Sequence, residues 1–336
     1  MLYSIISMNN RIKTLVTAIA ITAFALTALA ACGGEPEIVG VRGAAGAGDP
    51  VFPTLGNGGY DVSHYDLDLN IDPDANTLAG VATIDVRATE NLEAFNFDFA
   101  GPDVSSVRVN DEPAKFTREG IELTIEPAKM IPNDSDFTVV VAYGGTPEPF
   151  LFSDFDKING WFPFEGSVLL ASGGFQWYPN NQTPADPATY TMRLTVPKPL
   201  TATATGKLTA TVDNGDTSTY VWETTTPVGQ ALAAVAVTVS DSVLESIPGP
   251  NGLTINNYFP AGTPQGTKNR FKVASEIIEH FTGLFGPFPY DSFGITFLEG
   301  RMPGSGFSAP GRVFTNVTNQ KTLAHEIAHQ WFAGSV

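Results

Sequence analysis

Positive charge is scarce in this chain. Its 336 residues include 18 Lys and Arg against 35 Asp and Glu, which gives a net charge of −17 at pH 7. Because phosphate groups are bound by clusters of Lys and Arg, this composition argues against nucleic acid as a partner. Charged residues make up 16% of the chain and hydrophobic residues 43%, which favours a strand-rich globular protein over a disordered one. Solubility is the simplest explanation of the acidic excess, and a cationic substrate is the alternative.

Cysteine occurs once, at Cys32, so a disulfide within the chain is excluded. The cysteine follows Arg11, Lys13, an apolar run over residues 14–28 and a Leu-Ala-Ala tripeptide. The run is shorter than the roughly 20 residues of a membrane-spanning helix, and its surroundings are those of a secretory signal peptide. With the cysteine directly after the small residues, the segment resembles the signal of bacterial lipoproteins, in which the cysteine becomes the lipid-bearing first residue.

We therefore expect residues 1–31 to be a lipoprotein signal peptide and Cys32 to carry the lipid. Such a protein is anchored to a membrane of the cell envelope, because each buried CH2 group contributes about 0.8 kcal/mol. An ordinary secretory signal and an uncleaved anchor are the alternatives. Residues 32–59 are rich in Gly, Ala and Pro and predict a flexible tether.

The next long stretch alternates apolar and polar residues. Tyr65, Leu67, Leu69 and Ile71 each precede an Asp or Asn, and this period of two predicts a half-buried strand. Further strands are predicted at 81–88, 95–99, 107–109, 121–125, 137–143, 190–196, 219–224 and 231–239. Many short strands without an intervening helical pattern predict a mainly β amino-terminal domain, an antiparallel sandwich or saddle over residues 60–248.

Two features of this domain have a second interpretation. Its strand aspartates could bind calcium, but they lack the tight oxygen-rich loop that calcium prefers, so a solvated sheet face is the simpler explanation. The aromatic residues of 150–190, among them Trp161 and Trp177, could line a substrate cleft or pack the domain junction. We favour packing.

The pattern changes near Pro248. Apolar residues at helical spacing predict a helix over 267–284, and a strand follows at 293–298. Residues 299–311 are too rich in Gly and Pro for a regular element. A last helix begins near residue 319 or 320. Together these elements predict a second, α+β domain over residues 249–336.

The last predicted helix carries His325, Glu326 and His329 in the pattern H-E-x-x-H. Histidines four residues apart lie on one face of a helix, so both imidazoles can bind a single ion. The glutamate between them can act as general base on a water molecule activated by zinc. A catalytic zinc site has three protein ligands, and the third is unknown. Two structural histidines are the alternative, and we expect His64 and His280 on other elements to be packed or solvated.

Residues 325–334 resemble the H-E-x-x-H-x-W-F-G core of the membrane alanyl aminopeptidase family, the aminopeptidase N-like zinc metallopeptidases of gluzincin type. Ala333 replaces a glycine of that pattern. Residues 177–192 are similar to the family's W-F-P…A-T-Y segment, and residues 285–290 to its entry into the catalytic domain. The resemblance implies a saddle-like β domain, the start of a thermolysin-like catalytic domain, one Zn2+ ion, and peptide-bond hydrolysis with Glu326 as general base.

The resemblance also implies that the third zinc ligand is a glutamate on the next helix, beyond Val336, and that an oxyanion-stabilising tyrosine lies further on. We therefore expect the catalytic domain to be incomplete in this chain, and residues 33–336 to show weak or no activity alone. In the family, a G-x-M-E-N segment on an edge strand provides a glutamate that binds the substrate's free amine. The nearest match is 300–304, where uncharged Pro303 stands at the glutamate position, so exopeptidase and endopeptidase action both stay open, with Glu299 as a candidate substitute.

The sequence thus predicts a lipid-anchored, zinc-dependent, aminopeptidase-like peptidase whose partners are a peptide or protein substrate and a membrane. The alternative is a non-catalytic surface lipoprotein with a vestigial zinc site that acts as a binding module. The intact His-Glu-His set argues against this alternative, and Pro303 argues slightly for it.

Overall fold

The computed structural model describes residues 39–147, 150–151, 157–158, 160–164, 166–171, 173–229, 235–300, 302 and 304–332. By its contacts the chain divides into two units, Met1–Val39 and Gly40–Val336, and all described helices and strands belong to the second unit. The expected signal peptide and Cys32 lie outside the described residues. None of the described helices is both long and apolar enough to cross a membrane.

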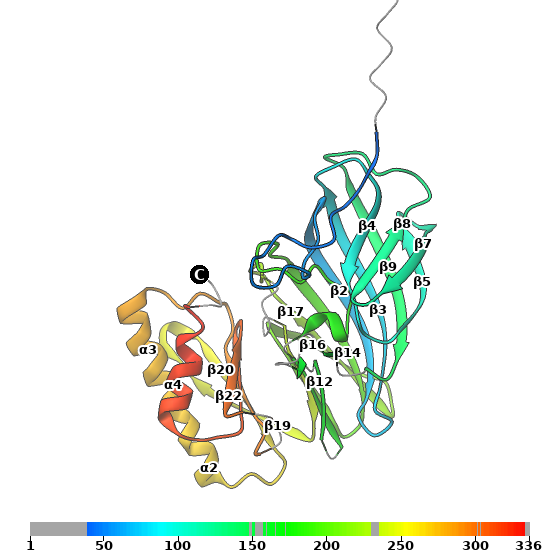
Figure 1. The fold of residues 1–336 in the computed structure, drawn as a ribbon. Coiled ribbons are helices and arrows are strands. Elements are labelled where there is room, and N and C mark those ends of the chain that lie inside the picture. Colours follow the sequence, from blue (N-terminus) through cyan, green and yellow to red (C-terminus); the bar gives the residue numbers. More distant parts are fainter. Residues whose placement is uncertain are drawn as a thin grey trace, which may run out of the picture. The chain divides into compact units, whose positions relative to one another are not determined.

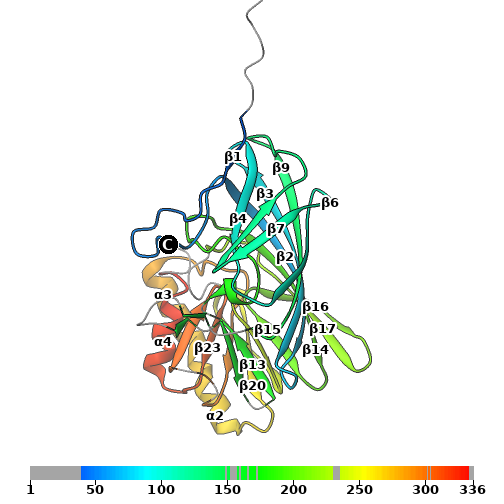
Figure 2. The same ribbon diagram turned by 45° about the vertical axis from the view of Figure 1, so that its right-hand side comes forward.

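An eight-stranded sheet is the largest sheet of the amino-terminal part (Figures 1 and 2). In spatial order its strands are β16 (Lys207–Asp213), β17 (Thr217–Glu223), β14 (Thr189–Pro197), β2 (Tyr60–Asp72), β3 (Thr77–Ala88), β9 (Asp136–Gly145), β5 (Asp103–Val109) and β6 (Glu112–Pro113). Alternate residues of β2 and β3 are buried, as the period of two predicts. The strands pair antiparallel except for β14 and β2, which are parallel, because the long chain between them re-enters the sheet from the same end.

A second sheet shares the hydrophobic core of the first. Its order is β1 (Val41–Arg42), β4 (Leu92–Asp98), β8 (Glu122–Glu126) and β7 (Lys115–Glu119). Phe95 and Phe97 of β4 are fully buried and meet the ring of Tyr60 edge-on, with centroid distances of 6.0 and 5.4 Å. Aromatic edges and faces attract in this geometry. The expected mainly β amino-terminal domain is confirmed.

Two smaller sheets complete this part. One has the order β12 (Trp161–Phe164), β13 (Ser167–Leu170), β18 (Val237–Ser240) and β15 (Thr201–Ala204), and the other pairs β10 (Phe150–Leu151) with β11 (Lys157–Ile158). Trp161 and Trp177 are buried in the main core. These two side chains therefore pack the interior, as favoured above.

Residues 40–59 differ from the expected flexible tether. Strand β1 pairs in parallel with β4, and Ala45 forms a bridge with Asn57. The backbone N–H of Gly56 and the side-chain amide of Asn57 both donate to Asp98 Oδ2 at 3.1 Å. The Gly- and Ala-rich composition indicated flexibility because such residues have no side chains that suggest a partner, whereas here backbone groups and the Asn57 amide make the contacts. The tether expectation is therefore wrong for residues 40–59.

The carboxyl-terminal part is a five-stranded sheet with helices on one face (Figures 1 and 2). The strand order is β19 (Ser242–Pro248), β20 (Thr254–Pro260), β21 (Gly294–Phe297), β23 (Arg312–Thr315) and β22 (Gly306–Ala309). The helices are α2 (Gln265–Asn269), η3 (Arg270–Lys272), α3 (Val273–Phe285) and α4 (Gln320–Ala328). Strand β19 pairs with β20 along its whole length, so the expected boundary at 248/249 falls inside a hairpin, and β19 belongs to the second part.

Apolar side chains from both main helices bind them to this sheet. Ile277 and Ile278 of α3 and Leu323 and Ile327 of α4 lie in one buried cluster with Ile295 of β21. The helical spacing of Ile277 and Ile278 is part of the pattern that predicts the helix over 267–284. The predicted helix over 267–284 forms as three consecutive short segments, α2, η3 and α3.

Candidate metal centre

Helix α4 is fixed in rotation by its cap and its apolar face. The Oδ1 atom of Asn319 accepts a hydrogen bond from the Thr322 N–H at 2.9 Å, which satisfies one of the free amides at the helix start. Leu323 and Ile327 are buried against the sheet. With that face packed, the face that carries His325 is exposed.

The two imidazoles of α4 approach each other through their Nε2 atoms. The Nε2 atoms of His325 and His329 are 3.2 Å apart, and the ring planes are nearly perpendicular at 88°. Two nitrogens bound to one tetrahedral zinc at about 2.0–2.1 Å would be separated by about 3.3 Å. The separation in this protein therefore fits two ligands of a single zinc ion.

The second ring nitrogen of His329 determines its tautomer. Nδ1 lies 3.2 Å from the carbonyl oxygen of Phe332. A carbonyl oxygen can only accept, so Nδ1 carries the proton and the lone pair of Nε2 is available to a metal. Zinc-binding histidines are oriented by hydrogen bonds of this kind.

Glu326 lies beside the two histidines but faces the interior. Only 6% of its surface is exposed. Burial raises the pKa of its carboxyl group above the ordinary value, and the neighbouring His325 and His329 partly offset this. A Cβ atom added to Gly306 of β22 would lie 3.3 Å from Glu326 Oε1, so the carboxyl group lies directly against that strand. A carboxyl group in this position can accept a proton beside the two imidazoles.

No third metal ligand joins these residues within the part of the chain that the structure describes. No group of three or more His, Cys, Asp or Glu side chains that could hold a metal ion is found among the described residues. His64 lies on β2, where Nδ1 is 2.8 Å from the Thr189 hydroxyl, and His280 lies on α3 with its ring tilted against Phe281. These two histidines belong to other elements, as expected.

The structure describes only part of the segment 300–304, in which Pro303 stands at the position of the family's glutamate. Arg301 and Pro303 lie outside the described residues. Asn316 donates from Nδ2 to the carbonyl oxygens of Met302 and Gly304, at 3.0 and 2.6 Å, and Met302 is buried. Glu299 is exposed and has a positive φ of 35°. These contacts hold the backbone at Met302 and Gly304, shortly before β22.

Gln330 is a residue of this site that no sequence pattern indicates. Gln330 is buried, with 1% of its surface exposed, and its amide contacts the hairpin formed by β22 and β23. Its position next to His329 was the only available hint. A glutamine at the end of a helix is usually solvated, so its contacts required the tertiary structure.

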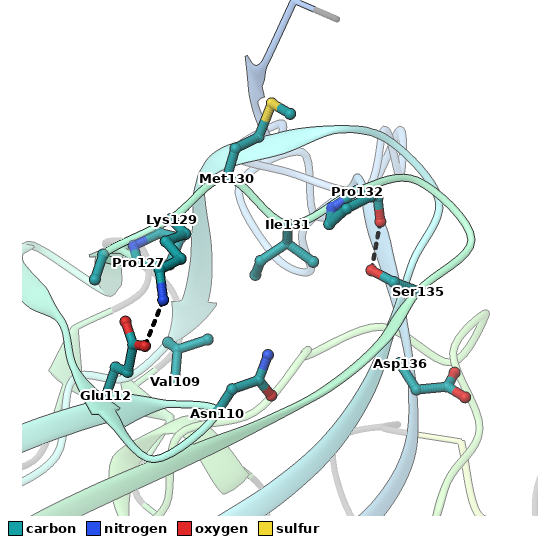
Figure 3. Close-up of a pocket in the computed structure, with 11 residues that line it drawn as sticks. Val109, Asn110, Glu112, Pro127, Lys129, Met130, Ile131, Pro132, Ser135 and Asp136 are labelled. Atoms are coloured by element: carbon teal, nitrogen blue, oxygen red, sulfur yellow. Dashed lines mark hydrogen bonds and ion pairs between the residues drawn. The ribbon is translucent and has the colours of Figure 1, made fainter.

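A separate pocket of about 280 Å3 lies in the amino-terminal part (Figure 3). It is lined by residues near the β5–β6 turn and by residues 127–136. Lys129 Nζ and Glu112 Oε1 pair with each other at 2.6 Å, and the Ser135 hydroxyl donates to Pro132 O. Because these polar groups are already paired, we assign this pocket no catalytic role.

Comparison with known proteins places the chain in a family. The profile of the peptidase M1 N-terminal domain matches residues 62–229. Leucine aminopeptidase 2 of Vanderwaltozyma polyspora is 22% identical over 293 residues, which are 81% of this chain and 43% of the relative. Aminopeptidase N of Acetobacter pasteurianus is 22% identical over 299 residues, which are 80% of this chain and 81% of the relative. The chain thus spans less than half the length of the yeast relative.

Solved structures give the same result. The M1 zinc metallopeptidase of Deinococcus radiodurans superposes with a TM-score of 0.77 at 27% identity, over 87% of this chain and 68% of that chain. Yeast LTA4 hydrolase shares the fold, with a TM-score of 0.66 at 20% identity over 82% of this chain and 44% of that chain. The fold is that of an M1 zinc metallopeptidase. This chain belongs to the M1 family, the aminopeptidase N-like zinc metallopeptidases.

Proposed function

We propose that this protein is a zinc-dependent peptidase that hydrolyses peptide bonds at the face of α4. The observation that carries the proposal is the 3.2 Å separation of the Nε2 atoms of His325 and His329, next to the buried carboxyl group of Glu326. One Zn2+ ion is the cofactor, because paired imidazoles on a helix are typical zinc ligands. The two histidines hold the ion together with a third ligand that lies outside the described residues.

Glu326 acts as the general base. Zinc, when bound, supplies Lewis acidity and lowers the pKa of a water molecule to about 7. Glu326 takes the proton of the attacking water on a carboxylate oxygen and transfers it to the nitrogen of the leaving amine. The hydrogen bond from His329 Nδ1 to Phe332 O keeps Nε2 free as a ligand throughout.

The test compares the wild-type protein with Glu326→Gln. We expect the variant to bind zinc like the wild type and to lose roughly 100-fold or more of its peptide hydrolysis, since a general base contributes about 10²–10⁴-fold. The measurements are zinc content by atomic absorption and chelator-sensitive peptide hydrolysis. Wild-type turnover in Glu326→Gln would refute the proposed mechanism.

Aminopeptidase action is the more specific part of the proposal. The support comes from the similar solved structures. A mutant of the Deinococcus enzyme binds a Tyr-Ser-Ala substrate, and similar mutant M1 zinc metallopeptidase structures contain L-arginine or L-tryptophan. The test is hydrolysis of one tripeptide with a free and with an acetylated amino terminus. Equal rates would show endopeptidase action, in line with Pro303 at the expected glutamate position.

We also propose that Cys32 carries a lipid that anchors the protein at the cell envelope. The support is the signal-like segment before it, with its short apolar run. In the producing bacterium, Cys32→Ser should move the protein from the membrane fraction and abolish labelling with a fatty acid. Unchanged fractionation and labelling would refute the anchor.

A further inference from the structure

Gln330 joins α4 to the hairpin of β22 and β23. Its Nε2 atom donates to the Ser308 hydroxyl at 2.5 Å and to Ala309 O at 3.1 Å. Its Oε1 atom accepts a hydrogen bond from the Gly311 N–H at 2.8 Å. One side-chain amide therefore satisfies both a carbonyl and an N–H at the closed end of the hairpin.

Glu326 contacts the same hairpin one helical turn earlier. Gln330 lies in the turn directly after α4, where its N–H donates to Ile327 O at 3.0 Å, and both Glu326 and Gln330 contact the β22 hairpin. At the open end of the strand, a Cβ atom added to Gly306 would lie 3.2 Å from Glu326 Cγ. Helix α4 and the turn that follows it thus meet the hairpin of β22 and β23 at two points.

Two contact points set both the height and the rotation of a helix against a strand. The contact at Gly306 is one of close approach only, with no hydrogen bond to hold it. The contact at Gln330 consists of three directed hydrogen bonds to a buried side chain. Together with the buried apolar face of α4, the hydrogen bonds of Gln330 therefore set the height of Glu326 above β22.

We propose that Gln330 is a positioning residue, which helps to hold the Glu326 carboxylate at the height where it can take a proton from the attacking water molecule. This inference rests on the proposed function. Gln330 itself contacts neither the metal ligands' Nε2 atoms nor the reacting atoms. Its loss should therefore affect the proton transfer step and leave zinc binding intact, because His325 and His329 lie on the neighbouring face of the helix.

The experiment uses the full-length protein with Gln330→Met, which keeps the size of the side chain and removes its hydrogen bonds. Gln320→Met is the matched control, because it makes the same change on the exposed first turn of the same helix. For Gln330→Met we expect kcat to fall about 10- to 100-fold, since a displacement of about 1 Å can cost this much. KM and zinc content should stay within about threefold of the wild type, because removal of a transition-state interaction alone lowers kcat. Gln320→Met should match the wild type.

Hydrogen exchange tests the contact between Gln330 and Gly311 without a measurement of activity. In metal-free protein, hydrogen exchange at the Gly311 amide should be faster in Gln330→Met than in Gln320→Met, because the acceptor of that N–H is gone. Wild-type kcat in Gln330→Met overturns the inference, as does parallel loss of zinc, which would make Gln330 a structural support of the metal site. If full-length wild-type protein with zinc bound shows no chelator-sensitive hydrolysis, the proposed function fails and this inference fails with it. An active wild type with a fully active Gln330→Met refutes the inference alone.

Discussion

Single buried polar residues hold together segments that are far apart in the sequence. Asp98 at the end of β4 accepts hydrogen bonds on Oδ2 from Gly56 N, Asn57 Nδ2 and Gln182 N, at 3.1, 3.1 and 2.8 Å. Burial raises the pKa of Asp98 to about 8, and the carboxyl group of Glu122, its partner in the strand register, contributes to the rise. The carboxyl group is therefore protonated in the folded protein over much of the range where an exposed aspartate is ionised.

This raised pKa predicts how stability depends on pH. The folded state binds the Asp98 proton up to about pH 8, whereas the unfolded state releases it near the ordinary value of 3.8. The favourable contribution is thus complete at acidic pH and is lost as the pH rises towards 8. Asp98→Asn resembles the protonated form, so its stability relative to wild type should rise by about 4 kcal/mol between about pH 5 and about pH 8. Urea unfolding at the two pH values measures this, and parallel pH curves for both proteins would contradict it.

Helix α4 shows how one short element is positioned by its neighbours. A helix of nine residues is too short to be stable on its own, so its cap and its buried face maintain it. Asn319 provides the cap, and Leu323 and Ile327 provide the buried face. The arrangement of His325 and His329 depends on both.

The cap gives a prediction for the metal centre. Asn319→Ala removes the acceptor for the Thr322 N–H and should lower stability by about 1 kcal/mol, with weaker zinc binding because the first turn of α4 frays. Asn319→Asp is the control, since aspartate caps helices as well as asparagine does. Thermal unfolding and competitive zinc titration are the measurements. Equal zinc affinity in all three proteins would show that the cap does not support the site.

In the whole molecule, Arg312 connects the sheets of the two parts. Its guanidinium lies over the rings of Trp222 and Tyr258, at 4.7 and 5.3 Å from their centroids. Nε donates to Ala204 O at 2.8 Å. Ala204 and Trp222 belong to the amino-terminal sheets, and Tyr258 belongs to β20. Burial lowers the pKa of Arg312 to about 10, so the side chain is still charged at neutral pH and is stabilised by two aromatic faces.

Removal of this side chain should uncouple the two parts. Arg312→Ala leaves a cavity and unpaired acceptors, and should lower stability by about 3 kcal/mol or more. We expect calorimetry to resolve two unfolding transitions in the variant, where the wild type shows one. Val243→Ala, at a half-exposed position of β19, is a control that should leave the profile unchanged. A single transition at the wild-type temperature in Arg312→Ala would show that other contacts couple the parts.

Local patterns in the sequence were sufficient to predict most helices and strands and the chemistry of the candidate metal centre. The period of two in β2, the helical spacing of α3 and the spacing of His325 and His329 depend only on the geometry of strands and helices, so they could be predicted without neighbours. The same patterns, with the family resemblance, indicated zinc and the role proposed for Glu326.

Tertiary structure decided what depends on partners distant in the chain. Residues 40–59 are held through backbone groups by β4, and β14 enters the sheet parallel to β2 over a long connection. Gln330, Asp98 and Arg312 are polar residues whose side-chain partners lie at least 16 residues away. From composition alone, such segments and side chains would be expected to be exposed to solvent. The chemistry of a polar side chain does not specify which distant group will be its hydrogen-bond partner. The sequence by itself indicated the two candidate histidine ligands and the candidate base, and the packing of α4 on the β22 hairpin determined where they lie.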